Sequence, residues 1–449
     1  MTKKKWALLI AGILLLFGYV KLFYKTYTET AVAKSADCII ALDIKRVTNT
    51  VIWNIITTPS QWKFSTSPDE EEDKVNWDDM VKLPDYVFLF HAASHPANAW
   101  YTVAHIKDEA DFKKGLQQFH FKKRENAEEY FSILAGIEFI QNGDKILVGN
   151  LAVEDKKFIR QVAAELFVKK QFAPKETLKT TVAARSHLAV QWAKNNFLLQ
   201  PAVIKANFDK NTITVDGSFS PAKQFSFAEN NFSYAASSLF SLGFTQPSAA
   251  LYNLIADSTK ANISSAMNFN IDSLLVQNNT CYKLDIAAIV PGVDSAITYT
   301  YDDNFNPIEK AVVNNILEPS FNFTVNGNGT GSVYRYWNNN GKLEKTAAGE
   351  LFVPVPFVKS YCSKLNAQKL AVVSNNYQAA PNDKNNNCIF FLNLLLTKIP
   401  NELLKFLPYG LMQAIGNIES LQLLAKKNNG QIFVHCSVNK KKNDLPIIQ

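Results

Sequence analysis

The sequence is poor in the residues that interrupt regular structure, with 17 glycines and 17 prolines among 449 residues. This content excludes a collagen-like chain and a low-complexity linker. Long apolar runs are also missing beyond the N-terminal segment, which excludes a membrane protein with many spans. The composition is globular, with 47% hydrophobic and 12% aromatic residues. A chain of this length is expected to form two domains or one duplicated domain.

Motifs that identify a reaction are absent as well. The sequence contains no GxSxG, HExxH, P-loop or CxxC motif. It therefore indicates no activated nucleophile, no metal-ligand set and no nucleotide loop. We predict no catalytic residue, no cofactor and no metal ligand.

Cysteine is scarce and its number is odd: the chain has Cys38, Cys281, Cys362, Cys388 and Cys436. The last three could form one disulfide in an oxidising compartment. The alternative is a set of small buried thiols. We favour buried thiols, because free cysteine is among the most buried residue types.

Basic charge is concentrated at the N-terminus. The net charge is +7, from 47 basic and 40 acidic residues. The first 25 residues contain no acid and five lysines, namely Lys3, Lys4, Lys5, Lys21 and Lys25. The rest of the chain is nearly neutral. This excludes a nucleic-acid-binding protein, because such proteins carry their positive charge on a folded face.

One segment near the N-terminus has the pattern of a membrane anchor. Its apolar residues are Trp6, Leu8, Leu9, Ile10, Ile13, Leu14, Leu15, Leu16, Phe17 and Val20. Extended to Tyr24, the segment forms a helix of about 28 Å, close to the thickness of a bilayer core. Lys3, Lys4 and Lys5 precede it, so the positive-inside rule places the N-terminus in the cytoplasm. We predict a single-pass inner-membrane protein whose body lies in the periplasm or outside the cell.

A cleaved signal peptide is the alternative interpretation of this segment. Ala31-Val32-Ala33 resembles a small-x-small cleavage site. It lies farther beyond Val20 than such sites usually do. We therefore favour an uncleaved signal-anchor, with the lipid bilayer as the partner of the N-terminal helix.

The body of the chain mixes strand and helix patterns. The run Ile39–Leu42 is typical of a buried strand, and Asp43 then caps a helix. Asp108 caps a second helix, and Asn142-Gly143 marks the turn of a hairpin. These patterns predict an α+β fold, in which antiparallel sheets carry helices on one face.

The second half of the sequence repeats this order. Three pairs of segments carry the repeat: Cys38–Asp43 with Ala266–Asp272, Asp144–Asn150 with Gln368–Asn375, and the hairpin around Asp209 with the hairpin at 420–438. The repeat predicts an internal duplication. The expected parts are the lysine-rich tip and anchor at 1–25, a first unit at 36–220, a connecting segment at 221–262 and a second unit at 264–449. In the second unit we expect a helix that contains Ile308, Val312 and Ile316, and a strand at Val333–Trp337.

Three further features have a functional and a structural interpretation. His91, His95 and His105 are close in sequence, and His91 and His105 can face each other across a predicted hairpin, but this spacing is unfavourable for a metal site. The glycine-rich segment 326–332 lies between two expected strands, which predicts a hairpin loop and not a phosphate-binding loop. The acidic segment Asp69–Asp73 lacks the spacing of a calcium loop, so we interpret it as a solvated loop.

The overall architecture resembles uncharacterised bacterial envelope proteins, which have one N-terminal span and a large extracytoplasmic region. Lys3–Tyr24, Cys38–Asp43 and the closing segment Gln431–Gln449 carry this resemblance. It implies no catalytic residues. We expect an extracytoplasmic protein that binds or scaffolds an envelope protein or lipid without catalysis. A carrier of an apolar ligand such as a lipid is the second hypothesis, and an enzyme with an unrecognised site is the third.

Overall fold

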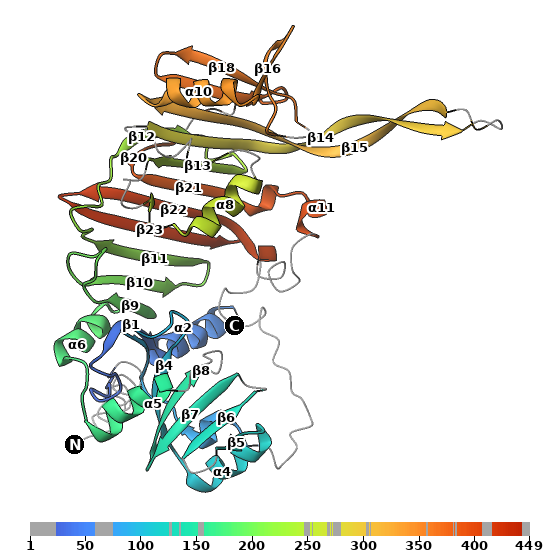
Figure 1. Ribbon diagram of the computed structural model, residues 1–449. Helices are drawn as coiled ribbons and strands as arrows, with labels where there is room; N and C mark the ends of the chain where they lie inside the picture. Colours follow the sequence, from blue (N-terminus) through green and yellow to red (C-terminus); the bar gives the residue numbers. More distant parts are fainter. Residues whose placement is uncertain are drawn as a thin grey trace, which may run out of the picture. The chain divides into compact units, whose positions relative to one another are not determined.

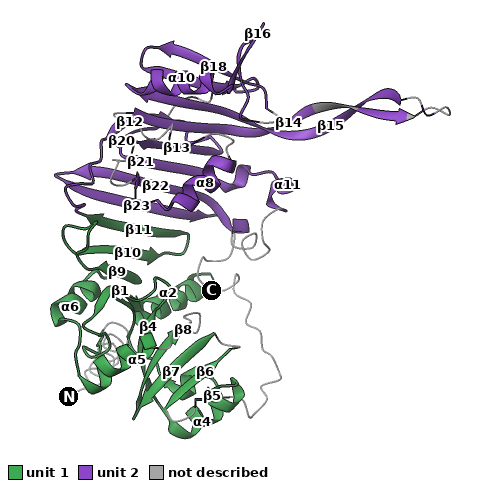
Figure 2. Ribbon diagram, in the orientation of Figure 1, with its two compact units in different colours: residues 1–219, 444–449 green, residues 220–443 purple. Residues whose placement is uncertain are grey.

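The structure of the chain is a computed structural model. It describes residues 24–58, 75–124, 128–133, 136–150, 157–246, 252–253, 255–266, 270, 272, 280–301, 305, 307–355, 358–379, 381, 384–405 and 415–441. Two compact units make up the chain, residues 1–219 with 444–449 and residues 220–443 (Figure 2). We refer to them as unit 1 and unit 2.

The fold is mostly β, with 48% of the described residues in strands and 23% in helices. The predicted α+β class is therefore wrong, because the helices are few and short. One cause of the wrong prediction is a residue spacing that fits both the period of a helix and the period of a strand. Ile308, Val312 and Ile316 recur every four residues, which fits a helix but also fits the two-residue repeat of a strand. They lie in strand β15, whereas Val333–Trp337 belongs to a helix.

Unit 1 is built on an antiparallel sheet. Its described strands are β1 (Ala36–Asp43), β2 (Val81–Lys82), β3 (Tyr86–Ala92), β4 (Tyr101–Ile106), β5 (Lys122–Lys123), β6 (Glu129–Ser132), β7 (Ile137–Asn142), β8 (Lys145–Asn150), β9 (Leu188–Trp192), β10 (Ala202–Phe208) and β11 (Thr212–Phe219). Its described helices are α2 (Ile44–Thr57), α3 (Trp77–Met80), α4 (Glu109–Gln118), α5 (Lys157–Ala163), the π-helix η2 (Ala164–Val168) and α6 (Lys175–Ala183). The strands follow the order β11, β10, β9, β1, β3, β4, β8, β7, β6 and β5, and β2 pairs with the end of β4.

The main core of unit 1 lies between this sheet and helices α5 and α6. Phe90 and Leu147 on the sheet are fully buried against Val162 of α5 and Leu178 of α6. A second cluster packs helices α3 and α4 on the strands β7 and β8. Burial of such side chains contributes about 1.5–3 kcal/mol each. The hydrophobic contacts thus hold the short helices in place.

The strands of unit 2 are antiparallel as well. Its described strands are β12 (Asn230–Tyr234), β13 (Phe240–Thr245), β14 (Thr280–Tyr301), β15 (Pro307–Gly327), β16 (Leu343–Thr346), β17 (Gly349–Phe352), β18 (Ser360–Asn366), β19 (Lys369–Ser374), β20 (Lys384–Cys388), β21 (Phe390–Leu395), β22 (Ile418–Asn428) and β23 (Gln431–Lys440). Its described helices are α8 (Asp257–Ala266), α10 (Thr330–Asn339), the 3-10 helix η3 (Leu396–Lys398) and α11 (Asn401–Leu404). The strand order is β23, β22, β21, β13, β14, β15, β19, β18, β17 and β16, with β12 and β20 as a separate pair.

The two units have the same strand order. Strands β1, β3 and β4 of unit 1 take the places that β13, β14 and β15 take in unit 2, and β8 takes the place of β19. The hairpin β10–β11 likewise corresponds to β22–β23. One of the three pairs of segments on which the repeat was predicted, Cys38–Asp43 with Ala266–Asp272, is matched wrongly. The counterpart of strand β1 is β13, which lies in the segment 221–262, whereas Ala266 ends helix α8.

No helix among the described residues is both long and apolar enough to cross a membrane. The longest of them, α2, has 14 residues, and a span needs about 20. The structure therefore contradicts the predicted single-pass inner-membrane placement and its signal-anchor. The residues from Lys3 to Val20 on which that prediction rested lie outside the described residues. Val32, the centre of the candidate cleavage site, is fully buried in the core of unit 1.

Candidate functional site

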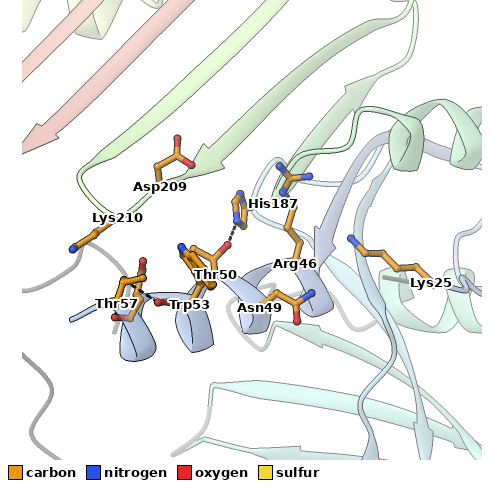
Figure 3. A pocket seen from close by; sticks show the side chains of 10 residues that line it. Lys25, Arg46, Asn49, Thr50, Trp53, Thr57, His187, Asp209 and Lys210 are labelled. Atoms are coloured by element: carbon orange, nitrogen blue, oxygen red, sulfur yellow. Dashed lines mark hydrogen bonds between the residues drawn. The ribbon is translucent and has the colours of Figure 1, made fainter. Parts of the chain in front are cut away.

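A cavity of about 570 Å³ lies beside helix α2 in unit 1 (Figure 3). Helix α2 supplies six of the side chains that line it, namely Arg46, Asn49, Thr50, Trp53, Asn54 and Thr57. The other four are Lys25, His187 just before β9, and Asp209 and Lys210 in the turn between β10 and β11. We call this cavity the α2 pocket.

The local sequence explains why α2 starts where it does. The carboxylate of Asp43 accepts a hydrogen bond from the backbone N–H of Arg46 at 2.8 Å, so the predicted N-cap is confirmed. The six lining positions recur at intervals of three or four residues, which places them on one face of the helix. The cap at Asp43 was predicted from the sequence, but the polar face of the helix was not.

His187 is a buried, neutral member of the pocket wall. Its Nδ1 accepts a hydrogen bond from the backbone N–H of Phe208 at 3.1 Å, so the ring proton is on Nε2. That nitrogen donates to Thr50 Oγ1 at 2.7 Å, which leaves the Thr50 hydroxyl hydrogen available to the pocket. Burial, and then the charge of Arg46, lower the pKa of His187 below 6.5.

The cations of the pocket differ in their partners. Lys25 forms an ion pair with Asp43, and the neighbouring Lys45 lies 3.4 Å from Asp85 Oδ1. In contrast, Arg46 and Lys210 form no ion pair with any residue that the structure describes. The first turn of α2 contains no acidic residue. A cation in this turn opposes the helix dipole at a cost of about 0.3–1 kcal/mol, so the position of Arg46 is unfavourable for the helix itself.

Lowering the pH from 7 to 5 is expected to destabilise unit 1 through His187. The pKa of this imidazole is below 6.5 in the folded chain, so the unfolded chain takes up the proton first. The stability that neutral His187 contributes is complete above pH 6.5 and is lost as the pH falls toward the lowered pKa. Urea unfolding at each pH, read by hydrogen exchange of β9 and β10, should show a smaller loss in His187→Gln. An equal loss in both proteins would contradict this assignment.

The histidines considered as metal ligands have separate partners. His91 Nδ1 contacts Asp37 Oδ1 at 2.7 Å, and its Nε2 donates to the carbonyl of Pro96 at 3.0 Å. His105 Nδ1 lies 3.2 Å from an Asp144 oxygen. The register of β3 and β4 does not bring His91 opposite His105. No group of three His, Cys, Asp or Glu side chains that could hold a metal occurs in the part of the chain that the structure describes.

The glycine-rich segment 326–332 has a different context from the one expected. It follows strand β15 and leads into helix α10, so the predicted hairpin loop is wrong. The backbone N–H of Gly329 donates to Thr280 Oγ1 at 3.2 Å, and Thr330 Oγ1 donates to the carbonyl of Gly327 at 2.8 Å. These bonds fasten the loop to the adjoining strands, and we assign no ligand to it. The acidic segment Asp69–Asp73 lies outside the described residues.

All five cysteines are free thiols, so the interpretation as small buried thiols is confirmed for the four that are buried. Burial, followed by the charge of Asp37, raises the pKa of Cys38 to about 12. Burial raises the pKa of Cys388 to about 11. Such thiols are poor nucleophiles, because the reactive species is the thiolate.

A second cavity, of about 420 Å³, lies in unit 2 beside the strands β14 and β15. Phe352 and Val358 form part of its wall, but Glu318, Glu344 and Lys359 also line it. A bound hydrocarbon would place these charged groups against an apolar surface, at a high cost in desolvation. The geometry of this cavity therefore does not favour a lipid carrier.

Strands β14 and β15 continue beyond their neighbours as a two-stranded ribbon (Figure 1). We define residues 288–301 and 307–319 as the arm. Val293, Tyr299 and Val313 of the arm are 65%, 59% and 64% exposed, and Leu317 is also exposed. The pairing of Val293 with Asn315 and of Tyr299 with Glu309 puts these apolar side chains on one face, because paired residues share a face in an antiparallel ladder.

Comparison of the chain with protein-family models, with curated proteins and with solved structures finds no match. The function must therefore be argued from the residues of the arm and of the α2 pocket.

Proposed function

We propose that this chain is a binding or scaffolding protein without a catalytic role, which holds a polypeptide partner on the apolar face of its arm. The observation that carries the proposal is the exposure of Val293, Tyr299, Val313 and Leu317 on a single face. Apolar side chains that gather on an exposed surface mark interaction sites in soluble domains.

The backbone of the arm supports the same proposal. Strand β13 pairs with β14 only over Cys281–Ile286, and β19 pairs with β15 only over Asn322–Asn326. Among the described residues, no other strand pairs along the arm, so the outer edge of each strand can accept a further strand. Few charges protect the edge of β14, because residues 288–301 contain one acidic residue and no basic residue, whereas the β15 half of the arm contains Glu309, Lys310 and Glu318.

Replacing Tyr299 and Val313 together by lysine is expected to lower the recovery of the partner at least tenfold. Each apolar side chain buried at an interface contributes about 1.5–3 kcal/mol, and 1.4 kcal/mol corresponds to a factor of ten in affinity. Both side chains are exposed, so the fold should be unaffected. The measurement is quantitative mass spectrometry of proteins cross-linked to the tagged full-length chain in its own cells.

The matched control is the double variant Thr298→Lys with Ile308→Lys. These residues are exposed on the opposite face of the arm, and the control adds the same charge. Selective loss of one protein from the Tyr299 and Val313 variant supports the proposal, and light scattering shows whether that protein is a second copy of the chain. Retention of the same proteins by both variants, or equal loss from both, rules out the apolar face as the binding surface.

A further inference from the structure

The α2 pocket combines an exposed aromatic ring with two cations that have no ion-pair partner among the described residues. Arg46 and Lys210 line it, and neither forms an ion pair with a described residue. Trp53 lines the same cavity and is 64% exposed. Figure 3 shows Arg46 near His187 and Lys210 near Thr57, so the two cations approach the cavity from different places along α2. This arrangement is independent of the arm and of the function proposed for it.

We infer that the α2 pocket binds a small organic oxyanion that carries a planar ring. The guanidinium of Arg46 binds the oxyanion, because its fork of N–H donors matches a carboxylate or a phosphate. The Trp53 indole packs against the ring, and Lys210 adds a second positive charge. The Thr50 hydroxyl, which accepts from neutral His187, donates to the ligand.

Three observations argue that the pocket is more than a surface depression. The helix gains nothing from Arg46 in its first turn, where a cation opposes the dipole, so a bound anion would give this residue its partner. Hydrogen bonds on both ring nitrogens fix His187, so the pocket wall is ordered without a ligand. Asp209 is the one acidic side chain among the described residues that line the cavity, so positive charge exceeds negative charge there.

Isothermal titration of the full-length chain tests the inference with four probes. Adenosine 5′-monophosphate has a ring and a phosphate, and indole-3-carboxylate has a ring and a carboxylate. Adenosine lacks the oxyanion, and inorganic phosphate lacks the ring. We expect one of the two ring-bearing anions to bind at least tenfold more tightly than both adenosine and phosphate. The better of the two identifies the oxyanion as a phosphate or a carboxylate.

Three variants and two matched controls assign the binding to this pocket. Arg46→Gln should weaken binding of the better probe at least tenfold, and Lys210→Gln should weaken it several-fold. Trp53→Leu should remove the advantage of the ring-bearing anion over inorganic phosphate. Arg185→Gln and Lys194→Gln remove the same charges from exposed positions of unit 1 outside the pocket and should leave the affinity unchanged.

The inference is overturned if no ring-bearing anion binds more tightly than adenosine, or if Arg46→Gln binds as tightly as Arg185→Gln. Hydrogen exchange across α2 verifies that each variant is folded. The arm variants serve as a cross-check, because Tyr299→Lys with Val313→Lys should bind the probe like the unmodified chain. Failure of the pocket experiment therefore leaves the proposal for the arm standing, and the reverse also holds.

Discussion

Replacing Trp337 by alanine is expected to lower the free energy of unfolding of unit 2 by about 3–5 kcal/mol. Trp337 lies in helix α10 and is 1% exposed. Its ring centroid lies 4.8 Å from that of Phe352 and 6.5 Å from that of Phe323. Truncation would leave a cavity between the helix and the sheet, and the neighbouring rings cannot fill it without leaving their rotamers.

Two further substitutions separate the destabilisation caused by the cavity from other consequences of replacing an aromatic residue. The Trp337 indole N–H is buried and has no hydrogen-bond partner in the described structure. Trp337→Phe removes this unsatisfied donor while it keeps an aromatic ring, so its cost should stay below about 1.5 kcal/mol. Phe305→Ala, at an 85% exposed position, should change stability by less than about 0.5 kcal/mol.

Urea unfolding followed by hydrogen exchange of peptides from α10 and β19 reads unit 2 separately from unit 1. The expected order of destabilisation is Trp337→Ala, then Trp337→Phe, then Phe305→Ala. If Trp337→Ala is no less stable than Phe305→Ala, then α10 does not pack on the sheet as described.

Local signals in the sequence predicted several elements of this fold. Asp43 and Asp108 both cap helices, because a carboxylate after a strand can accept the free N–H groups of a first turn. The turn at Asn142-Gly143 joins β7 and β8, and Gly143 has a φ of +61°, which glycine adopts without strain. Each of these features depends on residues that are neighbours in the chain.

Features that depend on distant residues were not predictable in this way. A spacing of four residues satisfies both a helix and a strand, so only pairing with β14 decides the conformation of the strand that contains Val312. In the wall of the α2 pocket, Thr50 forms a hydrogen bond with His187, and these two residues lie 137 positions apart in the sequence. A single sequence contains no signal for that contact. The unfavourable position of Arg46 in a helix that contains no acid in its first turn is the one local clue to the pocket.

The Asp43→Ala substitution is expected to lower the free energy of unfolding of unit 1 by about 2–4 kcal/mol. Asp43 is 1% exposed, and its carboxylate accepts from the backbone N–H of Arg46 and pairs with Lys25. Burial, and then this carboxylate, raise the pKa of Tyr86, whose hydroxyl also faces Asp43. Alanine would leave all three groups without their acceptor.

Two further variants, Asp43→Asn and Asp108→Ala, separate the contribution of the helix cap from that of the charge of Asp43. Asparagine keeps an acceptor for the helix N-terminus but removes the charge, so its cost should be intermediate. Asp108 caps α4 through the N–H groups of Ala110 and Asp111 at an exposed position, and its loss should cost about 0.5–2 kcal/mol, as for a simple cap. Hydrogen exchange of α2 and α4 during urea unfolding measures both. A cost for Asp43→Ala no greater than that for Asp108→Ala would show that the buried pair with Lys25 adds nothing to stability, and that α2 is held by its cap alone.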